Sequence, residues 1–247
     1  MTTENYLVFD IETVTIPYDE EHFSDSQREY LIRGAKSDEE RERKLAEMGL
    51  TPLTARVACI GMQLMQVSDE GDFSTVNRVA YSLDDTMGDD EKERVETLST
   101  GDTCYLSSER KLLENFWKLI SKVKPHLISF NGRNFDAPFL MLRSAVLGIR
   151  PSRNLMSGTK FNYPLHTDLI DELTFFSSSS YGATKRFNFD FYTRAFGLVS
   201  PKSEGIDGSK VSEFFAEGKI LEITEYCLRD VTATWQMYEI WMKYLRF

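Results

Sequence analysis

Apolar residues occur along this chain both as short unbroken runs and as stripes with helical spacing. The first run covers residues 6–9, almost at the N-terminus, and predicts a strand that is buried on both faces. Residues 56–67 and 73–82 predict the two strands of a hairpin, with its turn around residues 69–71. A further short strand is expected at residues 126–130.

The helical stripes predict three helices. Their apolar positions fall within residues 112–123, 135–147 and 223–242. Ser107 or Ser108 is expected to cap the first helix, and Asn134 the second. Because strands come first and helices then alternate with strands, the order is typical of an α/β sheet domain.

The composition is that of a globular protein. The chain has 247 residues, of which 41% are hydrophobic and 13% aromatic, enough for one domain with a large core. We expect no signal peptide and no membrane segment, because polar residues lead into the first strand and no apolar run approaches the roughly 20 residues that span a bilayer. The three cysteines are widely spaced, which indicates reduced thiols in the cytoplasm and no zinc pattern.

Four acidic residues and one tyrosine are the candidate catalytic residues. Asp10 and Glu12 follow the first apolar run, and side chains two apart on a strand share a face. Asp136 lies near the start of the second predicted helix, whereas Tyr226 and Asp230 are four apart on the last one. Clustered carboxylates repel each other unless cations neutralise them, so a shared location would indicate a two-metal phosphodiester-cleaving centre.

Each motif also has a purely structural explanation. Asp10 and Glu12 suit a polar strand end, Asp136 complements a helix dipole, and Asp230 with Tyr226 suits a helix surface. The structural explanation would have to hold at all three motifs together.

The three segments resemble, in order, the motifs of the DEDDy-type 3'–5' exonucleases of the DnaQ-like superfamily. The similarity is greatest to the proofreading exonuclease domain of family B DNA polymerases and its standalone relatives. The matching residues are Asp10, Glu12, Asn131, Phe135, Asp136, Tyr226 and Asp230. The segments 166–169, 188–191 and 196–198 resemble the connecting segments of that family. The resemblance implies an α/β ribonuclease-H-like fold, a mixed sheet flanked by helices.

The resemblance also implies roles for these residues in hydrolysing single-stranded DNA from its 3' end to nucleoside 5'-monophosphates. Two Mg²⁺ or Mn²⁺ ions are expected, with Asp10 bridging both, Glu12 and Asp230 completing the site of the ion that activates water, and Asp136 supporting the other. The hydroxyl of Tyr226 would orient the attacking water. Two further substrate contacts are expected, with Asn131 holding a water or phosphate and Phe135 stacking on terminal bases, although a turn and core packing explain them equally well.

The chain departs from the family pattern at residues 19–50 and 84–102, which are expected to be insertions in a single exonuclease domain covering residues 1–247. The first insertion is interpreted as a surface helix and the second as a mobile acidic loop; either could bind a protein partner. The sequence ends soon after the third motif, so we expect no polymerase domain in this polypeptide.

The net charge of −10 is unusual for a nucleic-acid-binding protein, although bound cations and the acidic insertions would account for much of it. Scattered basic residues, including Lys160, Lys185 and Arg186, are candidates for a substrate rim. The serine-rich loop at 177–182 either folds over a substrate or is an ordinary surface loop, and His166 is expected to be structural.

Three alternative functions are compatible with these motifs. A 3'–5' exoribonuclease would use the same metal site and differ in its contacts to the sugar. An endonuclease of the ribonuclease-H or junction-resolving type would share the fold, but the tyrosine spacing argues against it. A non-catalytic nucleic-acid or partner-binding module would be expected to have lost part of the acidic set, which is complete here.

Overall fold

The computed structural model describes residues 4–68, 71–200 and 208–246. Within them, the centre is one sheet of seven strands in the order β4-β5-β3-β2-β1-β6-β7. The strands are β1 (Asn5–Thr15), β2 (Ala55–Val67), β3 (Phe73–Leu83), β4 (Arg94–Thr97), β5 (Thr103–Ser107), β6 (His126–Ser129) and β7 (His166–Asp168). β2 runs antiparallel to both β1 and β3, whereas β6 and β7 continue parallel to β1, so the sheet is mixed.

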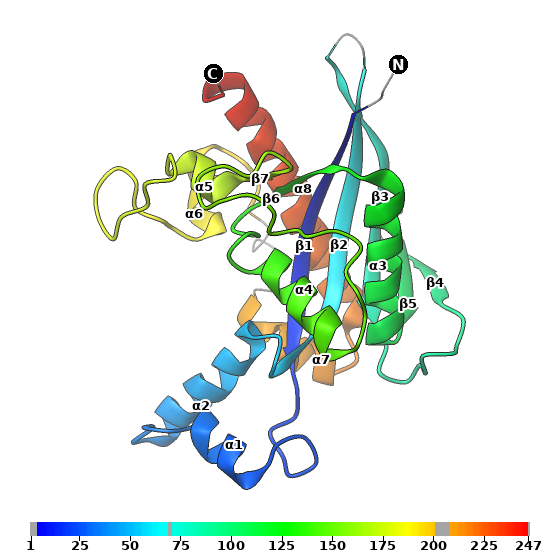
Figure 1. The fold of residues 1–247 in the computed structure, drawn as a ribbon, viewed down its shortest axis with the longest axis vertical. Helices are drawn as coiled ribbons and strands as arrows, with labels where there is room; N and C mark the ends of the chain where they lie inside the picture. The colour runs from blue at the N-terminus through cyan, green and yellow to red at the C-terminus, as the bar shows by residue number, and fades with distance from the viewer. Residues whose placement is uncertain (1–3, 69–70, 201–207, 247) are drawn as a thin grey trace.

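Helices cover both faces of the sheet (Figure 1). They are α1 (Asp25–Leu31), α2 (Asp38–Glu47), α3 (Glu109–Val123), α4 (Asp136–Val146), α5 (Leu169–Leu173), α6 (Phe189–Ala195), α7 (Val211–Ala216) and α8 (Ile220–Tyr244). Phe9 of β1 is buried with α3 and α4 residues such as Phe116 and Phe139, whereas Val8 packs on the opposite face with Trp235 of α8. The prediction of an α/β fold, with a mixed sheet flanked by helices, is confirmed.

Most predicted elements are present, with some changes in their bounds. Ser108 caps α3 by accepting from the Lys111 amide, as expected for one of the two serines. The hairpin strands are found as β2 and β3, but residues 69–70 of the predicted turn lie outside the described residues. Asn134 does not cap α4, because the cap position is Phe135, whose backbone has φ −129°.

The two predicted insertions differ in character. Residues 19–50 form two helices, α1 and α2, neither with a buried residue, and they project from the body of the molecule (Figure 1). The prediction of a mobile acidic loop at residues 84–102 is wrong for Arg94–Thr97, which form β4 and pair antiparallel with β5 at the edge of the sheet. β5 was not expected from the sequence either.

Among the helices of the described segments, none combines the length and apolar character required to cross a membrane.

Candidate active site

Asp10 and Glu12 lie in the middle of β1, not at its end as the sequence suggested. β1 continues to Thr15, paired throughout with β2, but the last pair that β1 makes with its other neighbour, β6, is Val8 with Ile128. The two acidic residues therefore lie just past the end of a parallel neighbour, where the sheet leaves a strand edge open. They share the face of β1 that carries Val8 and is covered by α8.

α8 brings the third carboxylate to this edge. Oxygen atoms of Asp10, Glu12 and Asp230 all lie within 4.8 Å of one another. Tyr226, one helical turn before Asp230, is buried and hydrogen-bonds to it. Asp10 and Asp230 are half-buried and Glu12 is buried, so the cluster lies at the boundary between the core and solvent.

A close approach between β2 and α8 sets the distance between Asp230 and the two acidic residues of β1. A Cβ atom on Gly61 would lie 2.8 Å from the sulfur of Cys227, so only glycine lets the helix pack this near the strand. The Cys227 thiol in turn donates to the Asp10 backbone carbonyl, with 3.4 Å between sulfur and oxygen. Cys227 is buried, as expected for a core residue.

Asp136 reaches the cluster from α4. Its carboxylate accepts a hydrogen bond from the Ile11 amide at 2.9 Å, between the two acidic residues of β1. Ile11 has no paired residue on β6, and the Asp136 carboxylate binds its amide instead. Asp136 is only 3% exposed. The structure therefore brings together the four carboxylates and the tyrosine that the sequence selected.

The electrostatics of the site are those of crowded, desolvated anions. Burial, followed by the charges of the neighbouring carboxylates, raises the pKa of Asp10 and of Glu12 well above their ordinary values. Burial also raises the pKa of Asp136 to about 7, against the opposing effect of the Ile11 hydrogen bond. Burial and the charge of Asp230 raise the pKa of Tyr226, so its hydroxyl remains a donor at neutral pH.

The donor set fits hard divalent cations. The cluster offers carboxylate oxygens. This ligand type suits Mg²⁺ and Mn²⁺ better than it suits zinc. Positive charge at this point would also remove the mutual repulsion that raises the pKa values of these carboxyl groups.

The two predicted substrate contacts lie on the turn before α4. Asn131 has a left-handed backbone with φ 65°, and Phe135 is partly buried, with its ring 5.6 Å from that of Phe139. Their contacts with substrate stay predictions.

Asp168 holds this turn, a role that sequence reasoning missed. Its carboxylate accepts from the amides of Asn131 and Arg133 at 2.7 and 2.8 Å. Asp168 is 1% exposed and lies at the end of β7, which pairs with β6. The available signal was an aspartate at a strand end, but its partner is 37 residues away along the chain. His166, on the same strand, is buried and hydrogen-bonds Ser129 at 2.7 Å, in agreement with a structural role.

Residues 73–246 match the family described as predicted 3'–5' exonucleases related to the exonuclease domain of PolB. The chain belongs to this family. Membership confirms the recognised resemblance to the exonuclease domain of PolB-type polymerases.

Relatives of this chain include archaeal DNA polymerases. DNA polymerase 1 of Pyrococcus abyssi is 24% identical over 221 residues, which cover 79% of this chain and 27% of the polymerase. DNA polymerase 1 of Sulfolobus acidocaldarius is 31% identical over 133 residues, covering 51% of this chain and 14% of the polymerase. The chain thus spans about a quarter or less of the length of these relatives.

Among solved structures, the zinc-bound complex of E. coli ExoI with single-stranded DNA is similar to this chain with a TM-score of 0.43 and 12% identity, covering 92% of this chain and 42% of that one.

Proposed function

We propose that this protein is a metal-dependent 3'–5' exonuclease that shortens single-stranded DNA from the 3' end and releases nucleoside 5'-monophosphates. The observation that carries the proposal is the convergence of Asp10, Glu12 and Asp230, whose oxygens lie within 4.8 Å of one another. Asp136 beside them, and Tyr226 bound to Asp230, complete the set that the family motif requires.

Each residue of the set has a proposed role in the reaction. Asp10, Glu12 and Asp230 would hold one divalent cation, and Asp10 with Asp136 a second one. The chemistry that two such cations supply is charge stabilisation at the phosphodiester and a lower pKa for the water that attacks it. Tyr226, kept protonated and fixed by Asp230, would orient that water through its hydroxyl.

Open solvent access on one side of the cluster suits an exonuclease. Asp10 and Asp230 are half-buried and reachable, whereas Glu12 and Asp136 form the buried side. A scissile phosphate entering from solvent would meet the reachable carboxylates first.

A reducing compartment, the cytoplasm, is the proposed location, because all three cysteines are buried and free.

The test uses a single-stranded DNA oligonucleotide labelled at its 5' end, with Mg²⁺ or Mn²⁺ and with chelator. Stepwise shortening with mononucleotide products, only when the cation is present, is the expected result. A circular single strand should survive, and its cleavage would identify an endonuclease instead. A matched RNA oligonucleotide distinguishes an exoribonuclease from the proposed enzyme.

A further inference from the structure

A cavity of about 480 Å³ is lined in part by the turn between β6 and α4. Arg133 and Asn134 form one wall, and they belong to the same turn that leads into Asp136. The opposite walls come from two loops, at residues 156–160 and around 178–186. The cavity is therefore continuous along the chain with the turn that positions one of the catalytic carboxylates.

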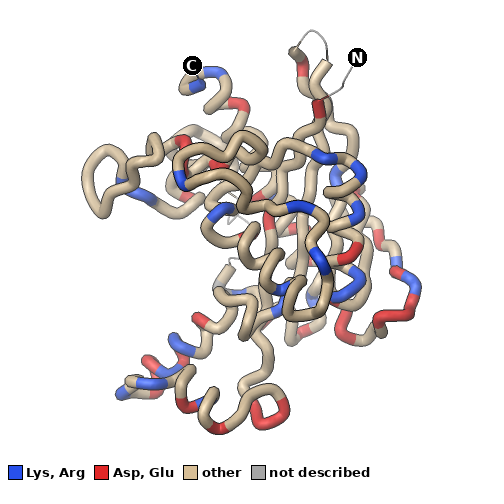
Figure 2. Tube along the Cα trace, viewed as in Figure 1, with Lys and Arg blue, Asp and Glu red and all other residues tan. Residues whose placement is uncertain are grey.

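The lining of this cavity is positively charged. Arg133, Lys160 and Arg186 face a single carboxylate, that of Asp171. The Asp171 carboxylate already has two partners, because it pairs with Arg186 and accepts a hydrogen bond from the Tyr163 hydroxyl at 2.8 Å. In a chain of net charge −10, an excess of cations at this one place indicates an anionic ligand. Figure 2 shows acidic positions gathered on the α1–α2 insertion and on the segment before β4.

Exposed aromatic rings accompany these cations. Hydrogen bonds between Thr159 and Asn162 close a turn whose two central residues are Lys160 and Phe161. Phe161 is 63% exposed, with the Lys160 ammonium 5.3 Å from its ring centre.

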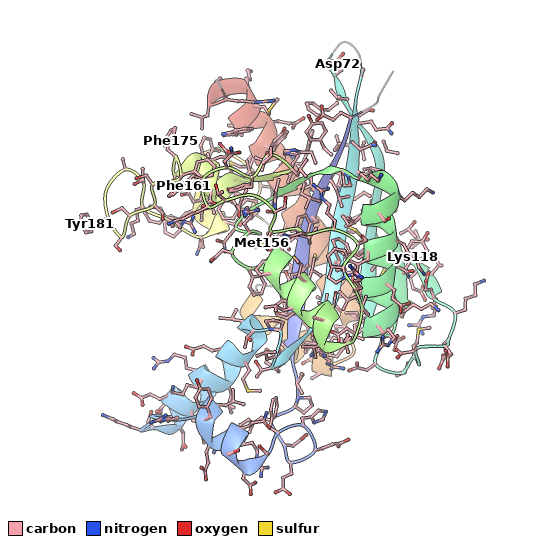
Figure 3. The ribbon with its side chains drawn as sticks, in the orientation of Figure 1. Asp72, Lys118, Met156, Phe161, Phe175 and Tyr181 are labelled. Atoms are coloured by element: carbon pink, nitrogen blue, oxygen red, sulfur yellow. The ribbon has the colours of Figure 1, made fainter. Side chains whose placement is uncertain are left out.

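The second loop repeats this arrangement. The Lys185 ammonium lies 4.8 Å from the ring centre of Phe187, which is 41% exposed and neighbours Phe191 at 5.0 Å. Tyr181, 81% exposed, lies at the outer tip of the loop, and Met156 and Phe161 lie nearer the body of the molecule (Figure 3).

We propose that these two loops, residues 156–161 and 178–187, bind the single strand upstream of the 3' nucleotide being removed; we call them the strand platform. The proposal rests on the proposed function and adds where the rest of the substrate lies. Lysine and arginine neutralise phosphates, and exposed aromatic faces accept any base by stacking. Alternation of the two side-chain types along two loops suits a strand that is read without sequence preference.

Binding without cleavage isolates the strand platform from the catalytic site. The protein is kept in chelator, and fluorescence anisotropy follows a labelled oligothymidylate long enough to cross both loops. Lys160→Ala with Lys185→Ala should weaken binding about tenfold and make the log–log salt dependence shallower by about 0.7 for each lost phosphate contact. Lys118→Ala with Lys122→Ala, exposed lysines of α3, is the matched control and should bind as the wild type does.

Stacking is tested separately at Phe161. Phe161→Ala should weaken binding on the order of tenfold, and Phe161→Tyr, which keeps a flat ring, should restore it. Equal binding by wild type and all platform variants would overturn the proposal. So would equally tight binding of polyglutamate, which would make this surface a site for acidic polypeptides.

Cleavage then separates this proposal from the proposed function. With Mg²⁺, the platform variants should lose activity on a long oligonucleotide but cleave a thymidine dinucleotide, whose single phosphate is the one cleaved, at the wild-type rate. Loss on the long substrate alone supports the platform. Wild-type rates on both substrates would overturn the platform and leave the exonuclease standing. If the wild type cleaves neither substrate, the proposed function fails, and the binding measurements in chelator still decide whether the platform exists.

Discussion

At the scale of single residues, the acidic cluster makes activity and stability respond to the same change in opposite directions. Asp10→Asn keeps the shape of the side chain but removes one of the repelling, desolvated charges. Exonuclease activity should fall at least about a thousandfold, since cation binding at such a site contributes several kcal/mol to catalysis. In chelator, the free energy of unfolding should rise by about 1 kcal/mol, a shift of roughly 2–4 °C in melting temperature.

The measurement for Asp10→Asn is a melting curve in chelator beside single-turnover cleavage with Mg²⁺. Asp72→Asn, an acidic residue near the far end of β2 and β3 (Figure 3), is a control that should change neither quantity. Near-wild-type cleavage by folded Asp10→Asn would argue against a metal site at this cluster.

Tyr226 is expected to contribute less to turnover than Asp10, and only through its hydroxyl. Its hydroxyl hydrogen-bonds to Asp230, while its ring is buried, so Tyr226→Phe removes the hydroxyl and keeps the packing. We expect turnover to fall by up to about a hundredfold, the cost of a misplaced nucleophile, and less than for Asp10→Asn. Single-turnover cleavage at saturating Mg²⁺ gives the rate, and a melting curve should show little change. A wild-type rate would reduce Tyr226 to a packing residue.

These residues could be identified from the sequence because their local spacing places each pair on one face of a strand or a helix. Asp10 and Glu12 share a face through the period of a strand, and Tyr226 and Asp230 through the turn of a helix. The role of Asp168 could not be predicted, because it depends on backbone amides that approach its carboxylate only after β6 and β7 pair. Local patterns carry no information on such a contact.

At the scale of elements, the position of α8 on β2 decides whether the cluster assembles. Gly61→Ala would place a methyl group 2.8 Å from the Cys227 sulfur and 3.2 Å from a Val231 methyl, so α8 must shift. We expect a loss of about 1–3 kcal/mol in stability, and a loss of activity because Asp230 moves with the helix. Gly49→Ala is the control, since its new methyl would meet Thr15 at an ordinary 3.7 Å. Denaturant unfolding and cleavage rates, measured on both variants, test this coupling.

The strands that the sequence failed to predict are β4, at one edge of the sheet, and its neighbour β5. β4 and β5 are short, and β4 is rich in exposed residues, so neither produces a long apolar run. β5 becomes a strand by pairing in parallel with β3, about 20 residues earlier in the chain. The central strands and the long helices were predictable because they bury enough of their own surface to set the pattern of their residues.

At the scale of the whole molecule, a buried histidine links global stability to pH. Burial, with the charge of Arg133 next, lowers the pKa of His166 to about 3. An unfolded chain would have this histidine near its ordinary pKa of about 6.5, so below that pH the unfolded state takes up a proton that the folded state refuses. The free energy of unfolding should therefore fall on acidification from about pH 6.5, by up to about 1.4 kcal/mol per pH unit.

Comparison with His166→Gln isolates this effect from the other titrating groups. Glutamine can still hydrogen-bond to Ser129, but it cannot take up a proton in this range. Urea unfolding of both proteins from pH 7 to pH 5 should give curves that converge as the pH falls. Parallel curves would mean that His166 titrates alike in the folded and unfolded states.

The contact between Asp136 and the Ile11 amide offers a spectroscopic reporter of the site. The amide proton of Ile11 bonds to a carboxylate where its neighbours on β1 bond to peptide carbonyls, so its NMR chemical shift depends on the charge held at Asp136. Titration of Mg²⁺ into ¹⁵N-labelled protein should move the Ile11 cross-peak, while that of Leu7, paired beside β6, remains in place. An Ile11 cross-peak that stays in place while other cross-peaks move would show that cations bind without reaching Asp136. Occupancy of the candidate metal site can thus be followed with no nucleic acid present.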